Sequence, residues 1–169
     1  GLIPLTNAEK IFLSKGGKEV PGSVVTSVLQ GTRPILVEIQ SLVVPTKMAF
    51  PRRIAQGIDA RRLELLLAVL IRRCGLPLYE QDVFVNVAGG IKVTEPAVDM
   101  AICVSIASSF FDKALSRKIL ALGEVGLLGE VRKVQGLERR VKEAKKLGYK
   151  VASAESGKSV AAAIKKLLN

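Results

Sequence analysis

The spacing of hydrophobic residues near the start of the chain predicts a β-hairpin. Two runs rich in β-branched residues, at 23–29 and 34–40, flank the turn-like segment 30–33. In the second run, hydrophobic residues occupy every other position, and the positions between them include Glu38. We therefore expect one face of this strand to lie in the core and the other to be partly exposed to water.

Apolar residues at helical spacing predict a long helix over 61–73, with Asp59 placed to cap its first turn. The stripe consists of Leu63, Leu66, Leu67 and Leu70. Leu65 and two further apolar residues widen the stripe, which indicates burial on two sides. The preceding segment 45–57 lacks periodicity and is predicted to be a loop.

The same two periodicities predict the remaining elements. They are a short helix at 7–13, a strand at 82–88 that resumes at 91–94 after Gly89-Gly90, an apolar helix from Pro96 to about Phe111, short strands at 119–124 and 129–134 joined by a turn at 126–129, a basic amphipathic helix at 137–147, a strand at 149–152 and a closing helix at 159–168. This mixture predicts an α+β (mixed α/β) fold. A chain of 169 residues buries roughly two-thirds of its unfolded surface, enough for one domain over 1–169.

Charge is the strongest compositional signal. The chain holds 26 Lys and Arg against 15 Asp and Glu, which gives a formal net charge of +11. A polyanion is the natural partner of such a surface, although a solvated basic surface that serves only solubility is the alternative. No apolar stretch reaches the roughly 20 residues that span a bilayer, so no membrane partner is expected. The chain begins with Gly rather than Met and carries no signal peptide, which favours a cytoplasmic fragment of something longer.

Residue types exclude several chemistries. The chain has no His, which excludes a Ser-His-Asp triad, a Cys-His dyad and any His-based zinc site. Its two cysteines, Cys74 and Cys103, lie among aliphatic residues and are predicted to be reduced core thiols. The segment 152–159 ends like a Walker A loop, but Ala152 replaces the first glycine and too few residues follow for a nucleotide-binding domain. A Ser-Lys dyad stays possible by composition, although Ser105, Ser108 and Ser109 on the apolar helix are more typical of packing.

Four segments resemble the Lon-protease-like domain at the C-terminal end of the bacterial RadA (Sms) family. The longest is Asp82–Asp99, and the others are 31–40, 51–70 and 123–132. Together with similarities at 1–2 and 11–14, the resemblance covers essentially the whole chain. It implies a Lon proteolytic-domain-like fold, of the ribosomal protein S5 domain 2-like type.

The resemblance also implies that peptidase chemistry is lost. In Lon peptidases the nucleophilic Ser follows the Pro that opens the apolar helix, and here Ala97 follows Pro96. The catalytic Lys of those enzymes follows a Gly-Leu pair after the later hairpin, where this chain has Glu138. Neither side chain can act as the activated hydroxyl or its base. We therefore expect this domain to have no catalytic residues, and we expect the fold to persist without peptidase activity.

The family implies a role in DNA repair and recombination. RadA proteins resemble hexameric helicases and promote branch migration, so we expect this domain to be a ring-forming scaffold, in a homohexamer, that binds DNA. No cofactor is expected in this domain, whereas ATP, Mg and Zn are expected in the full-length protein, and a RecA-type recombinase is a possible partner. The alternative from another class is a peptide-binding domain or residual Ser-Lys peptidase.

Five basic residues are the predicted DNA contacts: Arg33, Arg61, Arg62, Lys92 and Arg132. Arg33 lies in a turn, and Lys92 and Arg132 are expected to point outward from strands. Arg61 and Arg62 begin the long helix, where the helix dipole does not stabilise cations, so they suggest an external anion. For each residue, pairing with a local carboxylate or simple solvation is the alternative. The helix lysines Lys142, Lys145, Lys146, Lys165 and Lys166 are predicted to be solvated faces instead.

Overall fold

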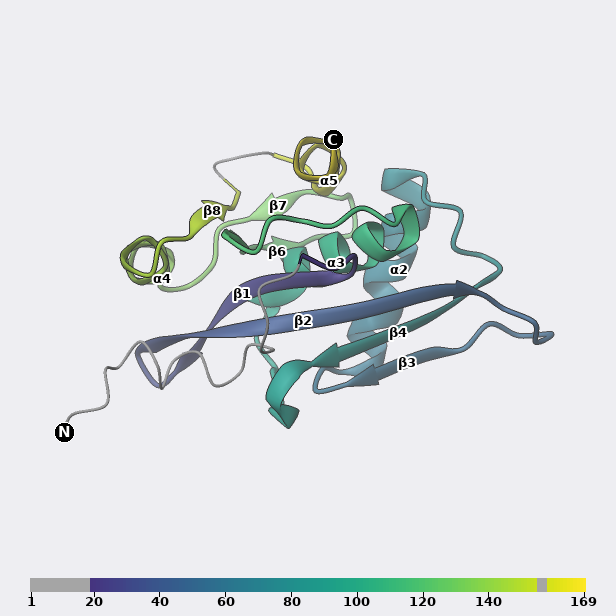
Figure 1. The fold of residues 1–169 in the computed structure, drawn as a ribbon, viewed down its shortest axis with the longest axis horizontal. Helices are drawn as coiled ribbons and strands as arrows, with labels where there is room; N and C mark the ends of the chain where they lie inside the picture. Colours follow the sequence, from purple (N-terminus) through teal and green to yellow (C-terminus); the bar gives the residue numbers. More distant parts are fainter. Residues whose placement is uncertain (1–18, 155–157) are drawn as a thin grey trace.

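The computed structural model describes residues 19–154 and 158–169 (Figure 1). The predicted helix at 7–13 and part of the segment 152–159 lie outside these residues. The elements are β1 (Ser23–Gln30), β2 (Arg33–Pro45), β3 (Arg53–Gln56), α2 (Ala60–Cys74), β4 (Gln81–Val87), the 3-10 turns η1 (Ala88–Gly90) and η2 (Pro96–Val98), α3 (Asp99–Phe111), β5 (Ile119–Ala121), β6 (Glu124–Val125), β7 (Val131–Arg132), α4 (Leu137–Lys146), β8 (Lys150–Ala152) and α5 (Val160–Leu168).

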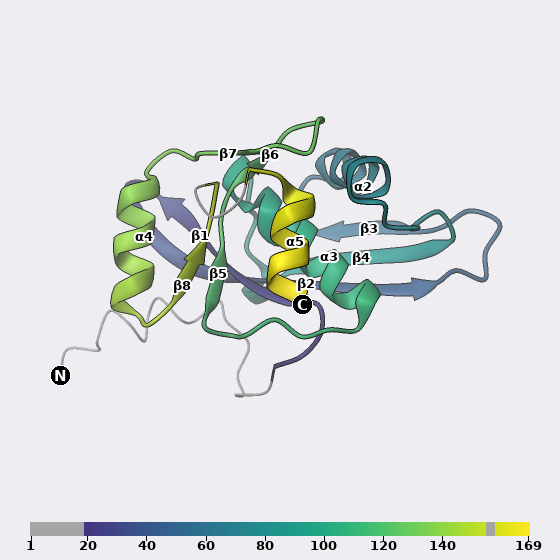
Figure 2. The ribbon, with the colours of Figure 1, turned by 90° about the horizontal axis from the view of Figure 1, so that it is seen from above.

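The strands form a six-stranded mixed sheet in the order β3-β4-β2-β1-β5-β8, and β6 and β7 form a separate hairpin. The pairs β1–β2 and β2–β4 are antiparallel, and the pairs β3–β4, β1–β5 and β5–β8 are parallel. Helix α3 packs on β1 and β2, and α2 and α5 pack against α3 (Figures 1 and 2). The predicted α+β class is confirmed.

The first hairpin forms as predicted, and both faces of its second strand are buried from Pro34 to Ile39. Val37 and Ile39 face the main core, which α3 closes. On the opposite face, Leu36 belongs to a second core with Ala97 and Ala144 of α4. The prediction that this face is partly exposed is therefore wrong at Leu36 and Glu38 and holds only from Gln40 onward. Even Glu38 is fully buried, where its carboxylate accepts a hydrogen bond from Gln40 and pairs with Arg117 at 3.5 Å.

Three predicted segments differ from the structure because long-range pairing overrides local pattern. Part of the predicted loop at 45–57 is the edge strand β3, which pairs in parallel with β4. The described residues 91–94 do not form the predicted strand. Instead, the Val93 amide donates a hydrogen bond to the Gly57 carbonyl at 2.7 Å. The predicted strand at 119–124 divides, so that β5 joins the large sheet and β6 joins the hairpin.

Helix α2 matches its prediction in extent and capping. The Asp59 carboxylate accepts a hydrogen bond from the Arg61 amide, and Gly75 ends the helix with φ of 70°. All four predicted stripe leucines are buried. Leu65, however, is 44% exposed, so the expected burial on two sides is wrong at that position.

Helix α3 is the centre of the core, and its serines have packing roles. Ser105 lies 2.6 Å from the hydroxyl of Ser41, Ser108 accepts from the Gly22 amide at 2.9 Å, and Ser109 accepts from the Val43 amide at 2.9 Å. Cys103 is buried in the same helix, and Cys74 is half-buried. Both are free thiols, and burial raises the pKa of Cys74 to about 11. Within residues 19–154 and 158–169, no helix combines the length and apolarity needed to cross a membrane.

Candidate nucleic-acid interface at the hairpin end

The turn between β1 and β2 lies against the start of α4. Figure 1 shows α4 beside this turn, at the end of the sheet opposite the loop between β2 and β3. The Arg139 guanidinium donates to the Thr32 carbonyl at 2.8 Å, which ties helix and turn together. Between them lies an open groove of about 920 Å³. It is lined by Leu29, Gly31, Thr32, Lys133, Val134, Gln135, Gly136, Leu137, Glu138, Arg139 and Lys142.

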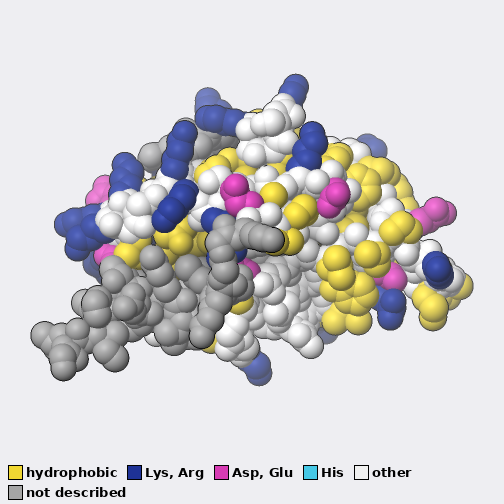
Figure 3. All heavy atoms as spheres, viewed as in Figure 1, with side chains coloured by type: hydrophobic (Ala, Val, Ile, Leu, Met, Phe, Trp, Pro, Cys, Tyr) yellow, Lys and Arg dark blue, Asp and Glu magenta, His cyan; other side chains and the backbone are white. Residues whose placement is uncertain are grey.

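The groove carries a strong excess of positive charge. Lys133, Arg139 and Lys142 line it and are exposed, and Arg33 is exposed at the adjoining turn. Glu138 is the acidic residue of the lining. Figure 3 shows Lys and Arg side chains gathered over α4. Such a concave basic surface concentrates anions and suits a phosphate backbone.

Beneath the groove lies a buried ion pair that the sequence analysis missed. Arg140 is 2% exposed and pairs with Glu95, while it also donates to the Ser27 carbonyl at 2.7 Å and the Gln135 carbonyl at 3.0 Å. The other Glu95 oxygen accepts from the Leu29 amide at 3.1 Å. These bonds join the floor of the groove to β1 and η2. The signal in the sequence was helical phase, because Arg140 shares a face with the buried Ala144.

The resemblance places the Lon catalytic dyad at positions 97 and 138. In the structure, the first position lies in a packed core and the second in the first turn of a helix. Ala97 is 4% exposed in η2, and its carbonyl accepts from the Gly123 amide at 2.9 Å. Its methyl group packs in the second core with Leu120 and Tyr149. Glu138 is exposed in the first turn of α4, where a carboxylate stabilises the helix dipole.

Arg62 is turned inward, unlike its neighbour Arg61. Arg61 is exposed at the start of α2, whereas the Arg62 Nε donates to Asp99 Oδ1 at 3.0 Å and its Nη2 to the Val125 carbonyl at 3.1 Å. Asp99 is 1% exposed and also accepts from the Val125 amide at 3.1 Å. Burial raises the pKa of the Asp99 carboxyl, and the hydrogen bonds from Arg62 and Val125 oppose that rise. Arg62 thus joins α2, α3 and β6.

Arg132 and Lys92 lie apart from the groove lining. Arg132 pairs with Glu130 at 2.9 Å, and its hydrogen bond lowers the pKa of that carboxyl, yet 56% of the Arg132 side chain stays exposed. Lys92 is exposed in the segment between η1 and η2, next to the buried Val93. Of the five predicted contacts, the structure therefore brings only Arg33 beside the groove. It adds Arg139 and Lys142, of which Lys142 had been assigned to a solvated helix face.

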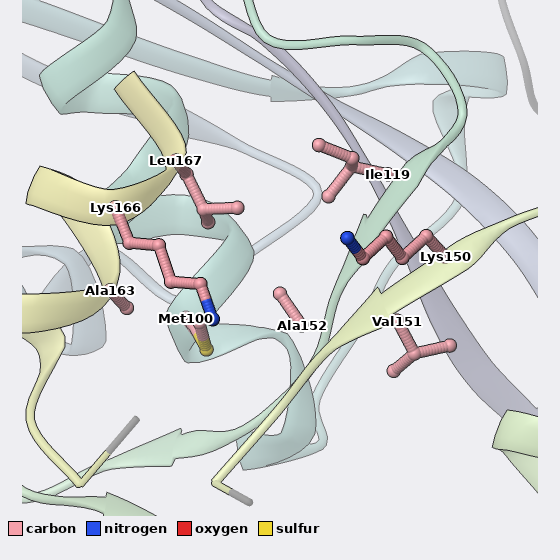
Figure 4. Close-up of a pocket in the computed structure, with 8 residues that line it drawn as sticks. All are labelled: Met100, Ile119, Lys150, Val151, Ala152, Ala163, Lys166 and Leu167. Carbon is pink, nitrogen blue, oxygen red and sulfur yellow. The ribbon is translucent and has the colours of Figure 1, made fainter. Parts of the chain in front are cut away.

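A smaller cavity of about 170 Å³ lies between α5 and the strands β5 and β8 (Figure 4). Its walls are mainly apolar, with Met100, Ala152 and Leu167 among them. Lys150 and Lys166 reach over it from β8 and α5. Aliphatic stems that cover apolar surface agree with a solvated role for Lys166. The described part of the chain holds no group of three or more His, Cys, Asp or Glu side chains that could bind a metal ion.

Comparison with known proteins identifies a family and a set of relatives. Residues 61–157 match the family model ChlI, described as subunit ChlI of Mg-chelatase. The chain is 53% identical over 150 residues to the DNA repair protein RadA of Bacillus subtilis (strain 168), covering 89% of the chain and 33% of that relative. It is 49% identical over 152 residues to the proteins of the same name from Pseudomonas aeruginosa and Escherichia coli (strain K12), covering 90% of the chain in both cases and 34% and 33% of the relatives. It thus spans about one third of their length. Because the family model matches more than half of the residues, the chain belongs to the ChlI family.

Proposed function

We propose that this chain is the Lon-protease-like, DNA-binding part of a RadA-type DNA repair and recombination protein. The observation that carries the proposal is the identity of about half the residues, over about 90% of the chain, to proteins named DNA repair protein RadA. The Lon-like part of the proposal rests on the four segments of this chain that resemble that domain. In this proposal the domain acts as a ring-forming scaffold.

The groove at the hairpin end supports the DNA part of the proposal. Arg33 presents a cation from the start of β2, and Arg139 and Lys142 present cations from α4, which a hydrogen bond ties to the turn before β2. Neutralising phosphates with such side chains releases counterions, which is the main source of sequence-independent affinity for DNA. A peptide-binding groove does not need this charge.

The surroundings of Ala97, Glu138 and the α3 serines agree with a loss of peptidase activity. Ala97 has no hydroxyl, Glu138 has no amine, and the buried pair of Arg140 and Glu95 bonds to the backbone of Gln135 and Leu29 in the groove lining. The serines of α3 donate to or accept from neighbouring backbone and hydroxyl groups in the core. An activated hydroxyl with an adjacent base is therefore not part of this proposal.

The remaining functions belong to the whole protein and are proposals on the same basis. The full-length protein would be an ATP-dependent branch-migration helicase that works in the cytoplasm, with a RecA-type recombinase as a partner. ATP, Mg and Zn would be held in the two thirds of the relatives' length that this chain does not span.

One experiment with two arms tests the proposal. An electrophoretic mobility shift of the 169-residue chain with DNA at two salt concentrations should show binding that weakens by about 0.9 log-unit per log-unit of salt for each phosphate contacted. A casein degradation assay on the same preparation should show no turnover. Salt-independent binding, or casein turnover that a substitution in this chain abolishes, contradicts it and favours the peptide-binding or peptidase alternative.

Ring formation is a separate expectation. Sedimentation velocity of the chain and of the full-length protein should show a closed oligomer, expected to be a hexamer, at high protein concentration. The apolar faces of the helices do not themselves argue for this, because the core buries them. A chain that stays monomeric, together with a full-length protein that never forms rings, would contradict the scaffold role.

A further inference from the structure

The turn between β6 and β7 exposes two adjacent leucines. Leu127 is 63% exposed and Leu128 is 72% exposed, and glycines flank them at 126 and 129. Figure 2 shows this turn projecting at the edge of the molecule, past α2. Two neighbouring large aliphatic side chains held in solvent suggest an apolar contact with another molecule.

Hydrogen bonds make this turn rigid. The Gly126 amide donates to the Glu130 carbonyl at 3.0 Å, the Gly129 amide to the Gly126 carbonyl at 2.9 Å, and the Leu128 amide to Glu130 Oε1 at 3.2 Å. A Cβ at Gly126 would lie 2.1 Å from the same Glu130 oxygen, so the turn closes around that carboxylate. The leucine side chains therefore project outward from a hydrogen-bonded turn.

Cations lie on both sides of the leucines. Arg73 of α2 donates from Nε to the Leu127 carbonyl at 3.4 Å and is exposed. On the other strand, Arg132 pairs with Glu130 but keeps more than half of its side chain exposed. Lys158 is exposed beside β7, where its carbonyl accepts from the Val131 amide. The apolar tip thus has a basic border, which a polyanion complements.

The tip is continuous with the basic groove. After β7, residues 133–135 line the groove at the hairpin end. Seven residues from Leu128 to Gln135 span at most about 25 Å, roughly the length of seven base pairs. A DNA duplex of about seven base pairs is therefore long enough to reach from the groove to the tip.

We propose that Leu127 and Leu128 form a wedge that unstacks base pairs in DNA held by the groove. The proposal rests on the proposed DNA-binding function. Apolar side chains that enter between base steps open the stack, and the exposed faces of the bases then bury the leucines in place of water. Arg73 and Arg132 would contact the phosphates on either side of the opened step. Such a wedge is suited to DNA forks and branched junctions, where base pairs must open.

The test uses the 169-residue chain and forked DNA with 2-aminopurine at the base pair next to the fork, because this base fluoresces more when it is unstacked. At saturating protein, the parent chain should raise the fluorescence. The variant L127S/L128S should lose most of that rise, while its affinity falls less than about tenfold because phosphate contacts persist. The matched control is L42S, which replaces a leucine of β2 that is 56% exposed. It should behave like the parent chain.

Each outcome decides the proposal. A full fluorescence rise in a folded L127S/L128S variant overturns the wedge and leaves DNA binding intact. An unchanged rise together with a loss of self-association assigns the leucines to contact with a second copy and also overturns the wedge. A parent chain that binds no DNA overturns the proposed function and the wedge together. Circular dichroism and the milder L127A/L128A variant separate these results from misfolding.

Discussion

Replacing Arg62 with alanine is expected to lower the free energy of unfolding by roughly 3–5 kcal/mol, because it leaves a buried charge without its partner. Asp99 is 1% exposed and would keep one hydrogen bond, from the Val125 amide. Urea denaturation followed by circular dichroism at neutral pH measures the loss. The matched control is Arg61→Ala, which removes an exposed guanidinium from the same helix and should change stability by less than about 0.5 kcal/mol.

The loss should depend on pH. Without Arg62, the pKa of the Asp99 carboxyl, which burial already raises, rises further. The folded variant then binds a proton at pH values where the unfolded chain, with an Asp carboxyl pKa of about 3.9, is still ionised. Stability of the variant therefore increases as the pH falls through the raised pKa, and the difference from the parent chain shrinks. Equal losses for Arg61→Ala and Arg62→Ala, or a loss independent of pH, would contradict the structural role of Arg62.

Replacing Arg33, Arg139 and Lys142 together with alanine is expected to weaken DNA binding roughly 10- to 100-fold near 0.15 M salt, if each contacts one phosphate. The plot of log affinity against log salt should become less steep by about 0.9 for each phosphate that is no longer neutralised. The loss should be uniform across DNA sequences, because phosphate contacts carry no direct sequence information. Fluorescence anisotropy with labelled duplexes at several salt concentrations provides the measurement.

The control for this experiment removes the same number of charges from helix surfaces outside the groove lining, at Lys145, Lys146 and Lys165. All three are exposed, and their replacement should reduce affinity by a smaller factor. If the control loses more affinity than the groove variant, with both folded, the DNA surface lies along α4 and α5 instead. Arg139→Lys adds a further check, because it keeps the charge at a site where the guanidinium also bonds to the Thr32 carbonyl.

Much of the secondary structure could be predicted because its signals are local. Period-two hydrophobic runs and a turn placed β1 and β2, and helical periodicity with the Asp59 cap placed α2. The edge strand β3 was missed because its four residues alternate only weakly and its partner β4 comes 30 residues later in the chain, with Arg53 opposite Val83. Strand pairing across such distances is decided by packing rather than by neighbouring residues.

The candidate site could be predicted only in part. Net charge indicated a polyanion, and Arg33 was predicted within the turn 30–33, whereas it pairs with Gln30 as the first residue of β2, directly after the turn at 31–32. Arg139 and Lys142 were not selected, because the approach of α4 to that turn depends on tertiary packing. The burial of Arg140 was missed for the same reason, since its partner Glu95 lies 45 residues earlier in the chain.

The sequence by itself determined the α+β composition, the positions of the described helices and the strong positive charge. Only the tertiary structure decided which cations stay exposed to an anion in solution. Arg61 and Arg62 are equivalent in sequence, but a difference of about 100° around the helix axis leaves one exposed and turns the other toward Asp99. A charged side chain is drawn inward only where folding supplies a buried partner, and that partner comes from a distant part of the chain.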